Sequence, residues 1–340
     1  MDEIDRQLLA RGGEQAKLTR ESMEAALDLA GLRPSQAEWQ EFAVRAMRFA
    51  GVLSLAAGVV FLVAFNWQNL GLYARFGMVE APLLAALVIA WVKGTDSSSG
   101  KLSLMLAVLL TGALLALFGQ TYQTGADVYE LFVAWAALTL PWVVACRYAP
   151  CWALWLLLLN AACGLYAGAS FHRGLFHLFI DHWQWSPWSM PFLLNLLLYV
   201  TLVMLSSWKE LGLSEGWLRR GVMAVAMAFG TFVMFYRIFQ SASSNDSGAA
   251  AALEILLYLG ASAAFAAHAY FQKEDVFNFA VLALSWIAVS STLLVRSMME
   301  RGAEIGVFFV LALYVIGCST GAVKGISYLG RQWRMEAVAK

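Results

Sequence analysis

Long apolar runs alternate with short polar breaks over most of this sequence. Each run has about the length that an α-helix needs to cross a bilayer, and a helix satisfies its own backbone hydrogen bonds in lipid. The pattern therefore predicts an all-α fold, a polytopic integral membrane bundle of about ten transmembrane helices. The expected spans are residues 43–65, 76–92, 102–118, 128–145, 149–170, 191–208, 221–239, 249–271, 277–295 and 305–323.

The positions of Lys and Arg decide how many of these runs cross the membrane. The weakest run, 76–92, is short and contains Glu80 and Pro82. Ten spans with a cytoplasmic N-terminus place 18 of the 23 basic residues on the inner side, as the positive-inside rule requires. Without 76–92, the same residues divide into 11 inside and 12 outside. The sequence therefore predicts ten spans, with both chain ends in the cytoplasm.

Charged residues are concentrated in the first part of the chain, which is expected to be a separate unit. The predicted division is a cytoplasmic helical segment at 1–42, a transmembrane domain at 43–325 and a cytoplasmic tail at 326–340. Ser35 and Glu38 have the spacing of a capping box, and no helix breaker follows before the first span. One continuous helix is therefore expected from Gln36 to about Ala64. Residues 1–35 are either a small helical cap on the membrane domain or a docking site for a cytosolic partner.

Composition agrees with a membrane location and excludes several classes of function. Hydrophobic residues make up 61% of the chain and charged residues 14%, with a mean hydropathy of +0.65. A soluble domain has about 25% charged residues. The 23 basic and 23 acidic residues cancel, so the chain lacks the basic surface that nucleic-acid binding requires. The lipid bilayer is the first partner that the sequence predicts.

One stretch of the sequence is distinctive. Residues 118–135 read FGQTYQTGADVYELFVAW, with Leu140-Pro141 after them and Phe65-Asn-Trp67 and Ala74-Arg75-Phe76 before them. Over residues 15–165 the chain resembles a bacterial family of polytopic membrane proteins known as domain of unknown function 2157. The resemblance implies the membrane topology and a multi-pass location in the bacterial inner membrane. It implies no activity, substrate or catalytic residue.

Charged side chains at membrane depth supply the candidate binding site, because each costs at least ~2.5–3.5 kcal/mol on insertion scales. In the ten-span topology, Glu80, Glu130, Glu254 and Glu304 lie just inside the outer helix ends, with Arg75 and Arg237 at the same level. We expect an outward-facing polar cavity in which these groups meet. Alternatively, each charge reaches the headgroups or forms a single interhelical pair. The candidate ligand-binding residues are Glu80, Glu130, Gln120, Tyr122, Asp127, Arg75, Arg237 and Glu254.

Catalytic, metal-binding and cofactor-binding patterns are not found. His172, His177 and His182 recur every five residues, which places successive imidazoles about 140° apart on a helix and not on one face. Cys146 and Cys151 do not have the C-x-x-C spacing, and an inner location favours free thiols. Phosphate-binding loops, nucleophile elbows and zinc-protease motifs are also missing. The sequence therefore predicts no metal and no cofactor, and it does not indicate an enzyme.

Two classes of function remain. The first is a transporter, or a membrane protein that binds a lipid or small molecule in the outward-facing polar cavity. The alternative is a non-catalytic assembly protein that holds a membrane or periplasmic partner. The Trp-rich outer loop 172–190 suits the alternative, as do the glycines repeated at four-residue spacing. Such glycine faces bring helices close together, either within the chain or in a homodimer, and they comprise Gly317, Gly321 and Gly325 in the last span and Gly164 and Gly168 in the fifth.

Overall fold

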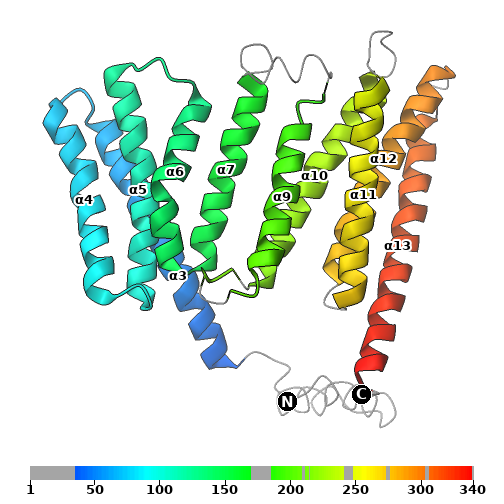
Figure 1. The fold of residues 1–340 in the computed structure, drawn as a ribbon, viewed down its shortest axis with the longest axis horizontal. Helices are drawn as coiled ribbons and strands as arrows, with labels where there is room; N and C mark the ends of the chain where they lie inside the picture. The colour runs from blue at the N-terminus through cyan, green and yellow to red at the C-terminus, as the bar shows by residue number, and fades with distance from the viewer. Residues whose placement is uncertain are drawn as a thin grey trace.

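The computed structural model describes residues 35–169, 185–208, 211–213, 215–240, 248–272, 276–302 and 306–338. These residues form ten helices and no strand, joined by short turns (Figure 1). The helices are α3 (Gln36–Phe65), α4 (Leu72–Lys93), α5 (Ser98–Tyr122), α6 (Val128–Cys146), α7 (Ala149–Ala169), α9 (Ser189–Leu205), α10 (Gly216–Gln240), α11 (Gly248–Gln272), α12 (Val276–Glu300) and α13 (Val307–Val338).

Successive helices run in opposite directions through one layer (Figure 1). Within the described residues, nine of them are long and apolar enough to span a bilayer, and α9 is an apolar helix of 17 residues. The predicted all-helical, polytopic architecture is confirmed. The first residue of α3 and the last of α13 lie at the same end of the layer (Figure 1). We call the opposite end, where α4, α6 and α9 begin, the outer end, following the predicted topology.

The ends of two helices show how the sequence sets their length. At the start of α3, the Ser35 N–H donates to Glu38 Oε2 at 2.7 Å, and the Glu38 N–H donates to Ser35 Oγ at 3.2 Å. The capping box is thus formed, and α3 runs unbroken from Gln36 to Phe65 as predicted. At the other end of the chain, α13 continues to Val338, well past the expected end of its span at residue 323. The predicted helices in residues 1–34 lie outside the described residues, and the domain boundaries stay predictions.

The helices form an elongated row and not a closed ring (Figure 1). Helices α4 and α5, α6 and α7, α9 and α10, and α12 and α13 pack in pairs, with further contacts of α5 with α6, α7 with α9, and α10 with α12. Helix α10 lies at the centre of the core, where Met223, Ala226, Met227 and Val233 are almost completely buried. Helices α3 and α13 bury little of their apolar surface. In a bilayer this surface would contact lipid chains, and exposing apolar side chains to hydrocarbon has no free-energy cost.

The glycine repeats do not mediate close packing inside the described part of the chain. A Cβ atom added at Gly317, Gly321 or Gly325 would meet no other atom within 4 Å, and the same holds for Gly164 and Gly168. Gly112 on α5 is different, because an added Cβ would lie 2.3 Å from the indole of Trp135 on α6. A close helix approach therefore occurs at Gly112, which the four-residue repeat does not include. A homodimer through α13 stays a prediction.

Candidate functional site

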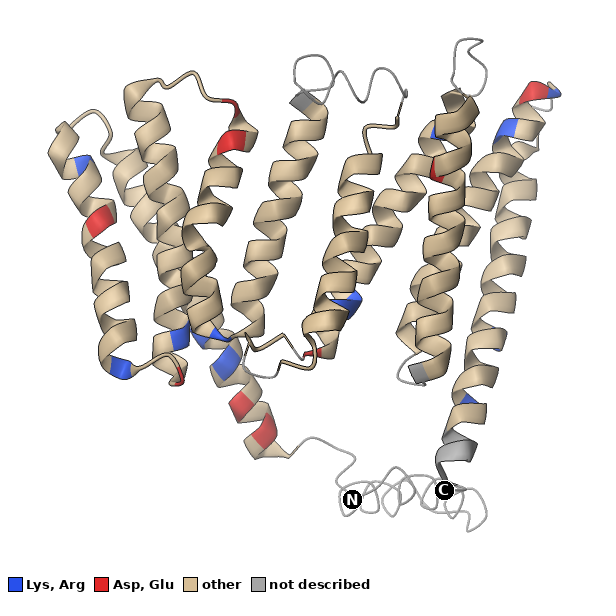
Figure 2. Cartoon of the chain, viewed as in Figure 1, with Lys and Arg blue, Asp and Glu red and all other residues tan. Residues whose placement is uncertain are grey.

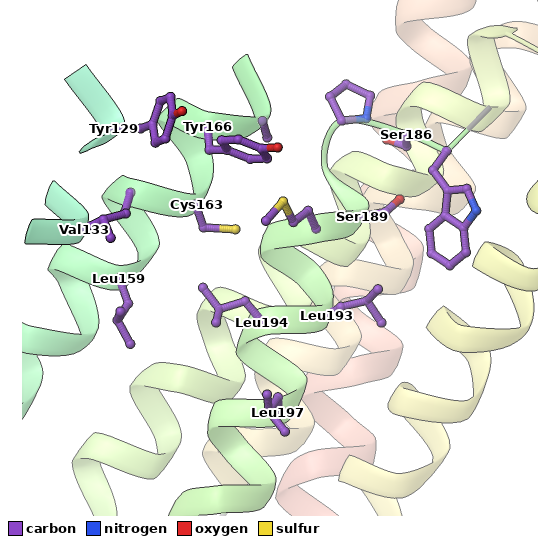
Figure 3. A pocket seen from close by; sticks show the side chains of 15 residues that line it. Tyr129, Val133, Leu159, Cys163, Tyr166, Ser186, Ser189, Leu193, Leu194 and Leu197 are labelled. Carbon is purple, nitrogen blue, oxygen red and sulfur yellow. The ribbon is translucent and has the colours of Figure 1, made fainter. Parts of the chain in front are cut away.

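A cavity of about 670 Å³ lies between α6, α7 and α9 near the outer end (Figure 3). Its volume falls within the ~300–1,000 Å³ that is usual for ligand sites. Aliphatic and other apolar side chains supply most of its wall, and they come from the facing sides of the three helices. The lining residues are Tyr129 and Val133 of α6, Leu159, Ala162, Cys163, Tyr166 and Ala167 of α7, Trp185, Ser186 and Pro187 before α9, and Ser189, Met190, Leu193, Leu194 and Leu197 of α9.

Two tyrosines flank the cavity at its outer end. The rings of Tyr129 and Tyr166 pack edge to face with their centroids 5.0 Å apart, and they join α6 to α7 above the aliphatic wall (Figure 3). Tyr129 also donates a long hydrogen bond of 3.5 Å to Glu130 Oε1. Tyrosine suits this level because its ring is apolar and its hydroxyl group prefers the headgroup region. The cavity is therefore apolar in its depth and more polar at its rim.

A buried polar cluster lies directly behind the α9 wall of the cavity. Glu254 of α11 is 1% exposed, and Arg237 of α10 is 5% exposed. Their side chains form an ion pair between Arg237 Nε and Glu254 Oε2. The other carboxylate oxygen accepts the backbone N–H of Ser186 at 2.7 Å and the hydroxyl of Ser189. Both serines also line the cavity, so this cluster fixes the start of α9 against α10 and α11 and thereby holds one wall in place.

The direction of these hydrogen bonds determines what the cavity presents to a ligand. The Ser186 N–H and the Ser189 hydroxyl hydrogen are both directed to Glu254. The buried carboxylate is thus compensated by three donor groups, as a charge in a low-dielectric setting requires. Because these donors point away from the cavity, a ligand would contact mainly apolar carbon atoms along the α9 wall. The predicted cavity is polar, whereas this one is mostly apolar with the charges behind it.

An amide pair joins α7 to α9 beside the cavity. Asn160 and Asn195 exchange two hydrogen bonds, 2.6 Å from Asn195 Nδ2 to Asn160 Oδ1 and 3.3 Å in the reverse direction. Each amide also donates to a backbone carbonyl one turn earlier, Leu156 O and Pro191 O. In lipid such amides hold helices together. The pair therefore links α7 to α9 directly, beside the wall residues Leu159 and Leu194.

Figure 2 shows that charged positions lie mostly toward the ends of the helices, and the predicted acidic residues of the first half are exposed. Glu80 is an exposed residue of α4, and Glu130 is exposed in the first turn of α6. Arg75, the proposed partner, lies 4.0 Å above the ring of Trp67 and donates to the backbone oxygens of Trp67 at 2.6 Å and Leu70 at 3.0 Å. Arg75 therefore stabilises the turn between α3 and α4. The structure does not bring it together with either glutamate.

The remaining candidates divide between the two halves of the protein. Gln120 lines a small cleft of about 200 Å³ between α3, α4 and α5, and Tyr122 packs on Phe118 with ring centroids 4.7 Å apart. Asp127 precedes α6 and makes no side-chain cap. Of the eight candidates, Arg237 and Glu254 are paired with each other. Ligand binding by these residues stays a prediction.

Several residues of the candidate site were not identified from the sequence. Ser186 and Ser189 lie 68 and 65 positions from Glu254, so their contact depends on how α9 and α11 pack. The leucines of the wall have no distinguishing pattern within uniformly apolar runs. The motif Ser-Pro-Trp-Ser at 186–189 is the one local signal, because one hydroxyl residue lies just before the apolar helix α9 and another begins it.

The described residues contain no group of three or more His, Cys, Asp or Glu side chains that could hold a metal ion. His172, His177, His182 and Glu304 lie outside the described residues. Cys146 and Cys151 are free, fully buried thiols with their sulfur atoms 2.9 Å apart at the turn between α6 and α7, which is the end of the layer opposite the cavity.

Comparison with known proteins finds one family to which the first part of the chain is similar. Residues 14–152 match the family described as "Predicted membrane protein (DUF2157)". This match confirms the resemblance seen in the first part of the sequence, and together with the apolar helices it shows a membrane protein with many helices of spanning length. No curated protein and no solved structure matches the chain. The cavity draws on both parts, because α6 lies within the matched region and α9 lies beyond it.

Proposed function

We propose that this protein binds the hydrocarbon chain of a membrane lipid in the cavity between α6, α7 and α9, within the bacterial inner membrane. The observation that carries the proposal is the cavity itself, about 670 Å³ bounded by aliphatic side chains of three helices. An empty apolar space of this size would cost the surrounding side chains their dispersion contacts. An apolar cavity also excludes water, which finds no polar partners in it. A lipid chain from the surrounding bilayer is the most abundant occupant that restores those contacts.

The polar groups around the cavity fit the same occupant. Tyr129 and Tyr166 lie at the outer end, where the headgroup of a bound lipid would meet them. The charges of Arg237 and Glu254 are compensated behind the wall and do not demand a charged ligand. The Asn160–Asn195 pair closes the seam between α7 and α9, which favours a binding role over passage of a molecule along that seam. Transport therefore has less support than binding.

The proposal is tested by filling the cavity. Leu159 of α7 lines it, whereas Leu157 on the same helix is 64% exposed and does not. We expect Leu159→Trp to reduce the lipid that stays bound when the full chain is examined by native mass spectrometry after gentle extraction. Leu157→Trp adds the same indole outside the cavity and should retain the wild-type lipid. Equal lipid retention by both variants, with both folded, would contradict the proposal.

A further inference from the structure

A second hollow, the aromatic groove, lies on the other side of the start of α9. It has a volume of about 460 Å³ and is lined by Trp188, Phe232, Phe235, Tyr236, Phe239 and Gln240. The five residues from α10 recur at helical spacing and so share one face of its last turns. None of the six lines the cavity between α6, α7 and α9.

The rings of the groove are partly accessible, and neighbouring rings are either tilted or edge to face. Trp188 and Phe232 have ring centroids 5.2 Å apart, and Phe232 and Phe235 meet edge to face at 6.1 Å. Trp188, Phe232 and Phe239 are 40%, 46% and 62% exposed. Aromatic faces carry negative partial charge and attract cations that come within about 6 Å of a ring centroid. The groove is therefore built from the side chains that bind an organic cation.

Two features besides the rings also favour a cation. Helix α10 ends at Gln240, and the carboxyl end of a helix carries partial negative charge. The Oε1 atom of Gln240 is buried and has no hydrogen-bond partner among the described residues. A buried acceptor without a donor is costly, so a ligand that supplies an N–H group would be favoured there. Rings, helix end and carbonyl oxygen all point to a cation that carries hydrogen-bond donors.

The charge of Arg237 does not oppose such a ligand. Its guanidinium group lies 5.8 Å from the ring centroid of Tyr236, but its side chain is buried and its charge is balanced by Glu254. Among the described residues, neither Arg237 nor any other Arg or Lys lines the groove. A cation that enters from the outer end would thus meet aromatic faces and an oxygen atom.

We propose that the aromatic groove binds the primary ammonium headgroup of a membrane lipid. A primary ammonium offers three N–H donors, one of which would satisfy Gln240, while its charge interacts with the rings. A quaternary ammonium has the charge but no donor, and a glycerol headgroup has no cation. A lipid is the source that fits, because the groove lies at the outer helix end, the level at which headgroups are expected. The assignment does not depend on the cavity between α6, α7 and α9.

The test compares three lipids with identical acyl chains on the full-length protein. Phosphatidylethanolamine, phosphatidylcholine and phosphatidylglycerol are supplied in equal amounts, and the lipid retained is measured by native mass spectrometry. We expect phosphatidylethanolamine to be retained roughly three- to tenfold more than either of the others, because phosphatidylglycerol lacks the cation–π contacts and phosphatidylcholine lacks the hydrogen bond to Gln240. Phe232→Leu should reduce the preference over phosphatidylglycerol, and Gln240→Leu should reduce the preference over phosphatidylcholine. Phe271→Leu, which changes an 80% exposed ring of α11 outside the groove, should leave it unchanged.

Three results would overturn the assignment. The first is equal retention of the three lipids. The second is retention of phosphatidylcholine at or above the level of phosphatidylethanolamine, since Gln240 would then play no part. The third is a preference that survives in Phe232→Leu and Gln240→Leu but disappears in Leu159→Trp, which would place the ammonium lipid in the cavity. Because Leu159→Trp tests total lipid and the groove variants test headgroup preference, failure of one proposal is distinguishable from failure of the other.

Discussion

The ion pair between Arg237 and Glu254 provides the sharpest test of how the cavity wall is held. Both residues are nearly inaccessible, and Glu254 also accepts the Ser186 N–H and the Ser189 hydroxyl. We expect Glu254→Leu to destabilise the protein strongly. The substitution takes the balancing carboxylate from a buried guanidinium and the acceptor from two buried donors.

The magnitude follows from these contacts. Loss of one member of a buried ion pair costs about 3–5 kcal/mol. Arg237→Leu should cost slightly less, about 2–4 kcal/mol on the same grounds, because Glu254 keeps its two serine donors. The double variant removes both charges, leaves the serine donors without an acceptor and should cost about 2–3 kcal/mol. The double-mutant cycle therefore predicts a coupling free energy of at least about 2 kcal/mol, which is about a 30-fold change in the folding equilibrium.

The assay is reversible unfolding of the purified protein in mixed micelles, followed by the loss of helix signal. A control is available in the same chain, since Arg296 and Glu300 form a pair at 2.7 Å in which Glu300 is 61% exposed. Its cycle should give a coupling of about 0.5 kcal/mol or less. A coupling below about 1 kcal/mol for the Arg237–Glu254 pair, equal to that of the exposed pair, would refute the reasoning.

Three further predictions concern packing and topology. Asn160→Leu should destabilise the protein by about 0.5–2 kcal/mol in the same unfolding assay, because Asn195 on α9 loses two hydrogen bonds. An unchanged stability would show that the pair is not formed. Gly112→Leu should lower the thermal midpoint of unfolding well below that of Gly321→Leu, because a side chain at Gly112 collides with an indole and one at Gly321 meets nothing. Equal midpoints would contradict the packing of α5 on α6. Loss of a dimer in Gly321→Leu would locate a homodimer on α13. In whole cells, a membrane-impermeant thiol reagent should label Asp127→Cys but not Lys101→Cys, and the opposite result would invert the predicted topology.

The sequence predicts the helices well because their signals are local. Apolar runs of spanning length mark each helix, and the capping box at Ser35 marks where α3 begins. Lys and Arg placement keeps 76–92 as a helix in spite of Glu80 and Pro82, and α4 indeed contains both residues. The length of α13 is underestimated because its last turns are polar and leave the apolar run, while they remain helical.

The candidate site is less predictable because it depends on which helices become neighbours. Depth in the membrane places Glu80, Glu130 and Glu254 at one level, yet the level does not say which helix each one faces. Glu254 is directed at α9 and α10 and is buried, while Glu80 points outward from α4. The aliphatic wall is harder still to predict, since a leucine that lines a cavity and one that faces lipid have the same local sequence context.

The central claim is that a hydrocarbon chain occupies the cavity between α6, α7 and α9. The most direct measurement is photocrosslinking in membranes with a lipid that carries a diazirine on its acyl chain, followed by mapping of the modified peptides. We predict that crosslinks concentrate on residues 159–167 and 189–197, which line the cavity, and decrease in Leu159→Trp but not in Leu157→Trp. Crosslinks spread evenly over all lipid-facing helices, with α13 modified as strongly as α7 and α9, would contradict the claim.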